Sequence, residues 1–246
     1  MTLLGRKIAI TGAGRGLGRA LAIVAADRGA IPILLGRSPE HLAQVRAAVG
    51  ERVNRFPDAF VCDLTEFSSI ADAADNIVRQ HPDLDALVHN GSQWSSGALD
   101  CQSDDSIAAV INSTVSGTIA LTKRLLPLLR ARPRADIHTV VSMSGLQYAR
   151  LVGSSLPFRA AKGAQDSFSQ GLIEEVKGSN IRITSIYPGL IEDVSPLDPA
   201  WETARGVADG LSNRDVVDAI LYALAAPPNV ALRQIVIERT RTEFLG

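Results

Sequence analysis

The chain has 246 residues, of which 46% are hydrophobic, 21% charged and only 4% aromatic, and its formal net charge at pH 7 is −1. This length suffices for one well-covered core, and a largely aliphatic composition suits buried parallel strands better than a sandwich of two sheets. A net charge so close to zero argues against nucleic acid or an anionic membrane surface as the main partner.

Strand-like runs alternate with helical patterns along the whole chain. The predicted strands cover residues 7–11, 31–35, 59–61, 86–89, 137–142, 181–187 and 234–237. The predicted helices cover residues 17–28, 40–49, 67–80, 103–130, 157–176 and 214–225. Such alternation is typical of βαβ units, whose right-handed crossovers place helices on both faces of a parallel sheet. The sequence therefore predicts a single α/β domain over residues 1–246, with a doubly wound, Rossmann-type parallel sheet of about seven strands.

One segment, residues 192–213, has no regular pattern and contains proline, aspartate, tryptophan and glycine. It lies between the sixth predicted strand and the last predicted helix. A mobile cover over a substrate and an ordinary surface connection both fit this composition. No motif in the segment indicates which substrate is bound.

The first predicted strand ends in a glycine-rich turn over residues 11–18, Thr-Gly-Ala-Gly-Arg-Gly-Leu-Gly, and a helical pattern follows at once. Glycines in such a turn let the backbone approach a pyrophosphate closely, and the helix N-terminus adds N–H groups and its positive dipole end. The flanking strand and helix supply the context that a lone glycine cluster lacks. A P-loop is excluded because no Gly-Lys-Ser/Thr follows. We therefore expect a nicotinamide cofactor to contact Gly12, Arg15, Gly16, Leu17 and Gly18.

The end of the second predicted strand bears on which cofactor is bound. An NAD site usually has an Asp or Glu there, which binds the ribose 2′-hydroxyl. This chain has Arg37 instead, and a guanidinium pairs well with a 2′-phosphate. Arg15, inside the glycine turn, is placed to flank the same phosphate. The two arginines favour NADP(H) over NAD(H), although two solvated surface arginines would give the same pattern.

Further motifs follow in chain order, and with the glycine turn they make the chain resemble the short-chain dehydrogenase/reductase superfamily over nearly its whole length. The matching residues are Asp63-Leu64, Asn90-Gly91-Ser92, Asn112, Ser142-Met143-Ser144, Lys162, Pro188-Gly189 and Ile191. The resemblance implies hydride exchange between the nicotinamide and a small carbonyl or alcohol substrate.

The resemblance also implies a role for each matching residue. Asp63 and Leu64 would contact the adenine, and Asn90 and Gly91 would close the fourth strand beside the cofactor. Asn112 would hold a water of the proton relay, and Ser144 would orient the substrate oxygen. Lys162 would bind the nicotinamide ribose. The nicotinamide itself would lie along Pro188, Gly189 and Ile191.

One position departs from the family at the centre of its chemistry. The family has Tyr-x-x-x-Lys on the fifth helix, and this chain has Phe158 four residues before Lys162. Residues four apart share a helix face, so the lysine ammonium lowers the pKa of the tyrosine and allows it to exchange a proton. Phe158 keeps the ring at this catalytic position but has no proton to give.

Three explanations of Phe158 remain open. It is an introduced substitution in an ordinary reductase, or a native residue in an enzyme with another proton donor, or a native residue in a non-catalytic sensor or scaffold that binds NADP(H). Candidates for another donor are Tyr148 and a water held by Asn112 and Lys162.

Smaller departures are Ser92, in place of a glycine, and Asp193, where the family often has a threonine that bonds the carboxamide. The histidines lack metal-ligand spacing, so no metal is expected, and Ser144 lacks the G-x-S-x-G context of a hydrolase nucleophile. Cys62 and Cys101 are too few for a disulfide framework. With no signal-peptide core or membrane-length apolar run, a cytoplasmic protein is predicted. The resemblance implies a homodimer or homotetramer.

Overall fold

The computed structural model describes residues 3–149, 153–203 and 211–240. Its main sheet has seven strands in the order β3-β2-β1-β4-β5-β6-β9, and every neighbouring pair is parallel. The bounds are β1 Lys7–Thr11, β2 Ile31–Gly36, β3 Ala59–Val61, β4 Ala86–His89, β5 Ala135–Val140, β6 Ile181–Pro188 and β9 Gln234–Ile237. The predicted α/β class with a seven-stranded, Rossmann-type parallel sheet is confirmed.

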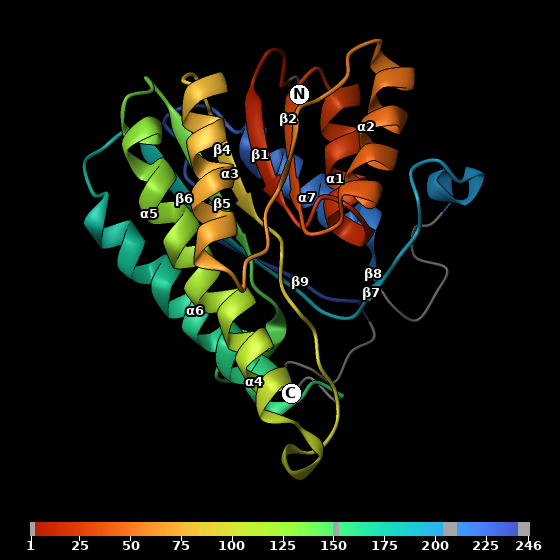
Figure 1. Cartoon of the computed structure of the whole chain (residues 1–246), viewed down its shortest axis with the longest axis vertical. Helices are drawn as coiled ribbons and strands as arrows, with labels where there is room; N and C mark the ends of the chain where they lie inside the picture. The colour runs from red at the N-terminus through yellow and green to blue at the C-terminus, as the bar shows by residue number, and fades with distance from the viewer. Residues whose placement is uncertain (1–2, 150–152, 204–210, 241–246) are drawn as a thin grey trace.

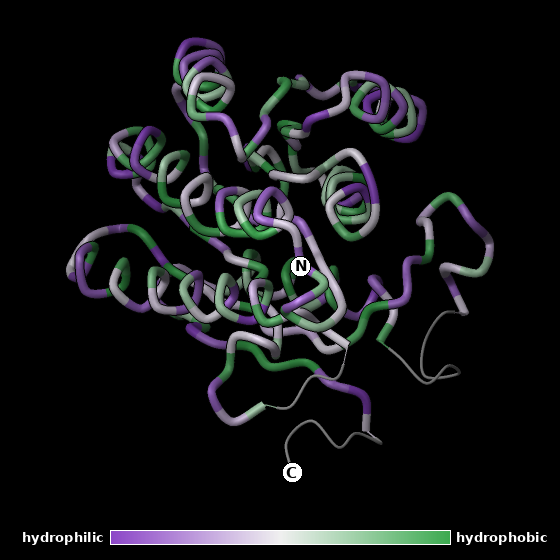
Figure 2. The backbone as a smooth tube through the Cα atoms, turned by 60° about the horizontal axis from the view of Figure 1, so that its bottom comes forward, coloured by the Kyte–Doolittle hydropathy of each residue, from purple (hydrophilic) through white to green (hydrophobic). Residues whose placement is uncertain are grey.

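Helices cover both faces of this sheet (Figure 1). One face carries α1 Gly16–Asp27, α2 Pro39–Val53 and α7 Asn213–Ala225, and the other carries α3 Phe67–Gln80, α4 Asp104–Ile111, α5 Gly117–Arg130 and α6 Leu156–Glu175. Each face has its own buried apolar cluster, one around Leu21 and Ile220 and one around Ile70 and Leu125. Figure 2 shows green and purple alternating along the helices, as expected when each buries one face.

The strand order fixes where a ligand can enter. β1 lies between β2 and β4, so the chain crosses from one side of β1 to the other after β3. Connections leaving the carboxyl ends of β1 and β4 therefore diverge and leave a crevice between them. Ligands of open α/β sheets bind at such a switch point.

The predicted helix over residues 103–130 is interrupted by a π-helical turn, Asn112–Ser116. Ser92 Oγ lies 2.8 Å from Thr114 Oγ1, and the Gln93 backbone N–H donates to Ser113 Oγ at 3.1 Å. The wider turn thus anchors the loop that follows β4. Strand β5 also begins and ends two residues earlier than predicted. A short parallel pair, β7 Ile191–Glu192 with β8 Leu211–Ser212, was not predicted.

A charged cluster closes the amino edge of the sheet, opposite the crevice. The Asp136 carboxylate, 1% exposed, lies 2.6 Å from an Arg6 Nη and 2.7 Å from an Arg182 Nη. These guanidinium groups also donate to backbone carbonyls at the end of α7 and just beyond it. Burial of this carboxylate is tolerated because both partners reach it. Across the described ranges, no helix is long and apolar enough to cross a membrane.

Candidate functional site

The glycine turn joins β1 to α1 and depends on three glycines. Gly12 and Gly16 have φ of +66° and +54°, a backbone conformation that other residues rarely adopt. A Cβ on Gly12 would lie 2.9 Å from Gly91 Cα, and one on Gly18 would overlap the Gly12 carbonyl oxygen. The turn is therefore packed against the end of β4, and helix α1 starts directly behind it.

Thr11 and Asn90 hold the two sides of this turn together. The backbone N–H groups of Asn90 and Gly91 donate to Thr11 Oγ1 at 2.9 and 2.8 Å, and Asn90 Nδ2 donates to the Thr11 carbonyl at 3.0 Å. These bonds fix the carboxyl ends of β1 and β4 relative to each other.

A cavity of about 650 Å³ opens over this turn. Its lining includes eight of the predicted cofactor-binding residues, namely Gly12, Arg15, Gly16, Arg37, Asp63, Leu64, Asn90 and Gly91. The remaining lining residues were not predicted to bind the cofactor, although the glycine turn, Cys62 and Ser92 were noted in the sequence; they are Gly14, Gly36, Ser38, His41, Cys62, Ser92, Gln93 and Ser113. His41 lies in the first turn of α2, close in the chain to Arg37, and its backbone N–H donates to the capping Ser38 side chain.

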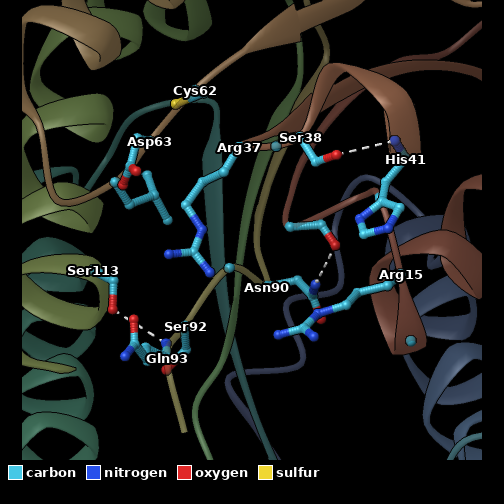
Figure 3. A pocket seen from close by; sticks show the side chains of 16 residues that line it. Arg15, Arg37, Ser38, His41, Cys62, Asp63, Asn90, Ser92, Gln93 and Ser113 are labelled. Carbon is cyan, nitrogen blue, oxygen red and sulfur yellow. Dashed lines mark hydrogen bonds between the residues drawn. The ribbon is translucent and has the colours of Figure 1, made fainter. Parts of the chain in front are cut away.

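Arg15 and Arg37 enter the cavity from different sides (Figure 3). Within the described part of the chain, neither guanidinium forms an ion pair or hydrogen bond. The Asp63 carboxylate lines the same cavity but forms no ion pair with either arginine in this part of the chain, and its Oδ1 accepts from the Thr65 backbone N–H and hydroxyl at 2.9 and 2.8 Å. The cavity therefore offers an anion two guanidinium groups that are not already engaged in an ion pair.

The other predicted cofactor-binding residues do not line this cavity. Leu17 and Ile191 pack beside the apolar cluster under α1, and Gly18 lies under the turn. Pro188 is buried at the end of β6, and the Gly189 backbone N–H donates to the Ile237 carbonyl at 3.0 Å.

A second group of predicted residues surrounds the end of β5. Ser144, 2% exposed, lies in the 3₁₀ turn Met143–Gly145, where its hydroxyl accepts from Ser142 Oγ at 3.2 Å. A Cβ on Gly145 would lie 2.8 Å from the Lys162 carbonyl oxygen, so this turn packs directly on α6. The fold thus brings the Ser144 turn and the Lys162 segment together, although these residues are not in the cavity lining.

Lys162 points into the protein interior. It is 3% exposed, and its Nζ donates to the Val140 carbonyl at 2.9 Å and to Gln165 Oε1 at 3.0 Å. Burial lowers the pKa of the Lys162 ammonium to about 7. Gln165 Nε2 in turn donates at 3.2 Å to the Thr114 carbonyl and to Thr118 Oγ1. Sequence reasoning did not select Gln165, a buried polar residue three positions after Lys162.

Phe158 belongs to the packing of the helices. It lies 7% exposed in an apolar cluster with Val110 and Ala161. Ser155 caps α6 and accepts from the Phe158 backbone N–H at 3.2 Å, so Phe158 lies in the first turn of this helix. The Lys162 Nζ is 5.7 Å from the centroid of the Phe158 ring, as a spacing of four residues predicts.

The two suggested sources of a replacement proton differ in their surroundings. Tyr148 is 64% exposed. Asn112 begins the π-helical turn, half-buried, and its Oδ1 accepts from Ser116 Oγ at the long distance of 3.5 Å.

The described part of segment 192–213 packs on the flank of the protein. Trp201 is 7% exposed in the apolar cluster shared with α1 and α7, and Arg214 Nη1 donates to its carbonyl at 2.6 Å. Residues 199–202 are therefore fastened to the outer helices and not laid over Ser144, which favours the surface-connection interpretation for them. Residues 204–210 lie outside the described ranges.

A family model described as short chain dehydrogenase matches residues 6–204. The chain belongs to the short-chain dehydrogenase family. It is 26% identical over 238 residues to an uncharacterized oxidoreductase of Staphylococcus saprophyticus, covering 96% of this chain and 99% of that protein. It is therefore a member of a family of oxidoreductases.

Solved structures with similar chains have the same fold. A structure described as a short chain dehydrogenase of Shigella flexneri 2a, complexed with NADP, is 27% identical, covers 95% and 97% of the two chains and has a TM-score of 0.81. An L-sorbose reductase of Gluconobacter frateurii, complexed with NADPH and L-sorbose, is 21% identical over 96% of both chains, with a TM-score of 0.83. The second likeness concerns the fold alone.

Proposed function

We propose that this short-chain dehydrogenase binds NADP(H) and exchanges hydride with a small carbonyl or alcohol substrate. The observation that carries the proposal is the cavity with Arg15 and Arg37 unpaired beside a glycine turn that a single Cβ would block. Arg37 stands where an NAD site needs a carboxylate, and the Shigella relative is complexed with NADP.

The cofactor-holding residues fit a dinucleotide. Gly12, Gly16 and the first N–H groups of α1 would receive the diphosphate, while Arg15 and Arg37 would take the 2′-phosphate. Asp63 and Leu64 border the same cavity, where the adenine would lie.

The nicotinamide, when bound, supplies or accepts the hydride. Ser144 Oγ accepts a bond from Ser142, so its own proton is free to donate to a substrate oxygen. That bond would orient and polarise a carbonyl. Phe158 offers no proton, so the proton must come from water or another side chain.

A second candidate function is NADP(H) binding without efficient turnover, as a sensor or scaffold. It is favoured by the packing of Phe158 among apolar side chains and by the Lys162 ammonium on Val140 and Gln165. Both side chains are buried, and neither lines the cavity at the glycine turn.

The deciding experiment compares the parent chain with Phe158→Tyr while NADPH oxidation is followed over ketones, aldehydes and sugars. Phe168→Tyr is the control, because it adds the same hydroxyl elsewhere on α6. We expect about 10²–10⁴-fold more turnover for Phe158→Tyr only, the usual contribution of a general acid.

The other results separate the alternatives. Clear turnover in the parent without a gain in Phe158→Tyr would identify a different proton donor. Absence of turnover in both, with tight NADPH binding, would favour the sensor or scaffold. Failure of all three proteins to bind NADPH would refute the proposed function.

A further inference from the structure

Asp193 lies beside the glycine turn although the two are far apart in the sequence. It follows β7, and its Oδ2 lies 3.7 Å from the point where a Cβ on Gly16 would be. Gly16 lines the cavity and begins α1. A carboxylate oxygen therefore stands beside the backbone that is expected to receive the cofactor's diphosphate.

The position of this carboxylate is fixed by Asn213, which is 1% exposed at the start of α7. Asn213 Nδ2 donates to Asp193 Oδ1 at 2.9 Å and to the Val194 carbonyl at 2.7 Å, and its Oδ1 accepts from the Val194 backbone N–H at 3.1 Å. A buried amide with three bonds thus holds Asp193 through only one of its two oxygens. Across the described ranges, the other oxygen, Oδ2, has no hydrogen-bond donor.

The start of α1 attracts such a negative charge. The helix has 12 residues, no acidic residue in its first turn and no side chain bonded to its first N–H groups. A helix N-terminus carries a partial positive charge, so a nearby carboxylate is stabilised there. A phosphate is stabilised at the same end for the same reason.

We propose that Asp193 sets the affinity of this protein for its cofactor by competing with the diphosphate for the amino end of α1. The inference rests on the proposed NADP(H) binding and adds a determinant of its strength. In the free protein the carboxylate partly neutralises the helix end. When a dinucleotide binds, the carboxylate and the phosphates repel each other where water is being expelled.

Asp193→Asn tests this competition because it removes the charge and keeps the shape and an oxygen for Asn213. Glu192→Gln is the matched control, since it removes an exposed carboxylate from the neighbouring residue. NADPH is titrated against each protein, with cofactor fluorescence as the signal. We expect Asp193→Asn to bind NADPH about tenfold more tightly than the parent, and Glu192→Gln to match the parent within about twofold.

Three further measurements exclude a merely structural effect. Adenosine 2′-monophosphate has the 2′-phosphate but no diphosphate, so Asp193→Asn should bind it as the parent does. The gain for NADPH should also shrink at high salt, because exposed charges are screened. The melting temperature of free Asp193→Asn should not rise, because the helix end has lost a favourable charge.

The outcomes separate this inference from the proposed function. NADPH binding of equal strength in the parent and Asp193→Asn overturns the competition and leaves cofactor binding intact. An equal gain in Glu192→Gln, or an equal gain for adenosine 2′-monophosphate, also overturns it. No NADPH binding by any of the proteins overturns both proposals.

Discussion

Arg37 is the side chain that should distinguish the two nicotinamide dinucleotides, because it enters the cavity directly after β2. Arg37→Asp reverses the charge that would face a 2′-phosphate and restores an acceptor for a ribose hydroxyl. We expect NADPH to bind about 100-fold more weakly to Arg37→Asp than to the parent. NADH should bind with nearly the same affinity or more tightly, and the two dissociation constants measure both effects.

Arg55→Asp makes the same charge change on an exposed side chain outside the cavity lining, and it should leave both constants near the parent values. Equal weakening of NADPH and NADH by Arg37→Asp would show that Arg37 does not recognise the 2′-phosphate.

What the sequence reveals at the residue scale depends on how local the signal is. The glycine turn and Arg37 were identifiable because each follows a strand directly in the chain. The partners of Lys162 were not, because Val140 lies on β5 and Thr114, which Gln165 contacts, lies in the π-helical turn. Likewise, Asp193 meets Gly16 only after the whole sheet has assembled.

At the scale of elements, the π-helical turn Asn112–Ser116 positions the start of α5 against the loop after β3. A Cβ on Gly117 would lie 2.8 Å from Leu64 Cβ and even closer to the Leu64 carbonyl oxygen. The sequence predicted one continuous helix here, because a single wide turn leaves the apolar pattern of residues 103–130 almost unchanged. The side-chain bonds that favour the π turn come from a distant loop.

Gly117→Ala should therefore lower the free energy of unfolding by about 1–3 kcal/mol and weaken NADPH binding, since Leu64 borders the cavity. Gly171→Ala is the control: it lies inside α6 with no atom within 4 Å of the added Cβ. There the better helix propensity of alanine should raise the free energy of unfolding by roughly 0.5–1 kcal/mol. Urea denaturation measures both free energies of unfolding. If Gly117→Ala left this free energy unchanged, it would contradict the close approach of Gly117 to Leu64.

At the scale of the whole molecule, three buried histidines, His81, His89 and His138, couple folding to pH because burial lowers the pKa of each, and the effect is large for the last two. Burial lowers the pKa of His89 to about 3 and that of His138 to about 4, from 6.5 in the unfolded chain. Both are neutral in the folded protein, so they contribute their full stability above pH 6.5, the pKa in the unfolded chain. This stability is lost as the pH falls from there toward the lower pKa values of the folded protein. At His89 and His138 alone, the unfolded state then binds about two more protons than the folded one.

We expect these two histidines to lower the free energy of unfolding by roughly 2–2.5 kcal/mol per pH unit between about pH 6 and 5, since each fully bound proton contributes ~1.36 kcal/mol per pH unit and the unfolded histidines are not yet fully protonated at pH 6. Urea denaturation at several pH values measures this slope, and His89→Gln should reduce it by about half. A flat profile would mean that the histidines are not buried as neutral groups.

The single domain predicted from the sequence requires one transition seen alike by fluorescence and circular dichroism. The predicted homodimer or homotetramer calls for a mass measurement in solution.

The charged cluster at the amino edge has a consequence for synthesis on the ribosome. Arg6 Nη1 donates to the Leu224 carbonyl at 2.8 Å, and Arg182 Nη1 donates to the Val230 carbonyl at 2.6 Å. The ribosome releases β1 first, yet Arg6 lacks this acceptor until nearly the whole chain has emerged. Asp136 likewise lacks its partner Arg182 until that residue has been synthesised. A chain that stops before residue 224 therefore leaves both guanidinium groups without these carbonyl acceptors, and we expect it to be less stable than the complete chain.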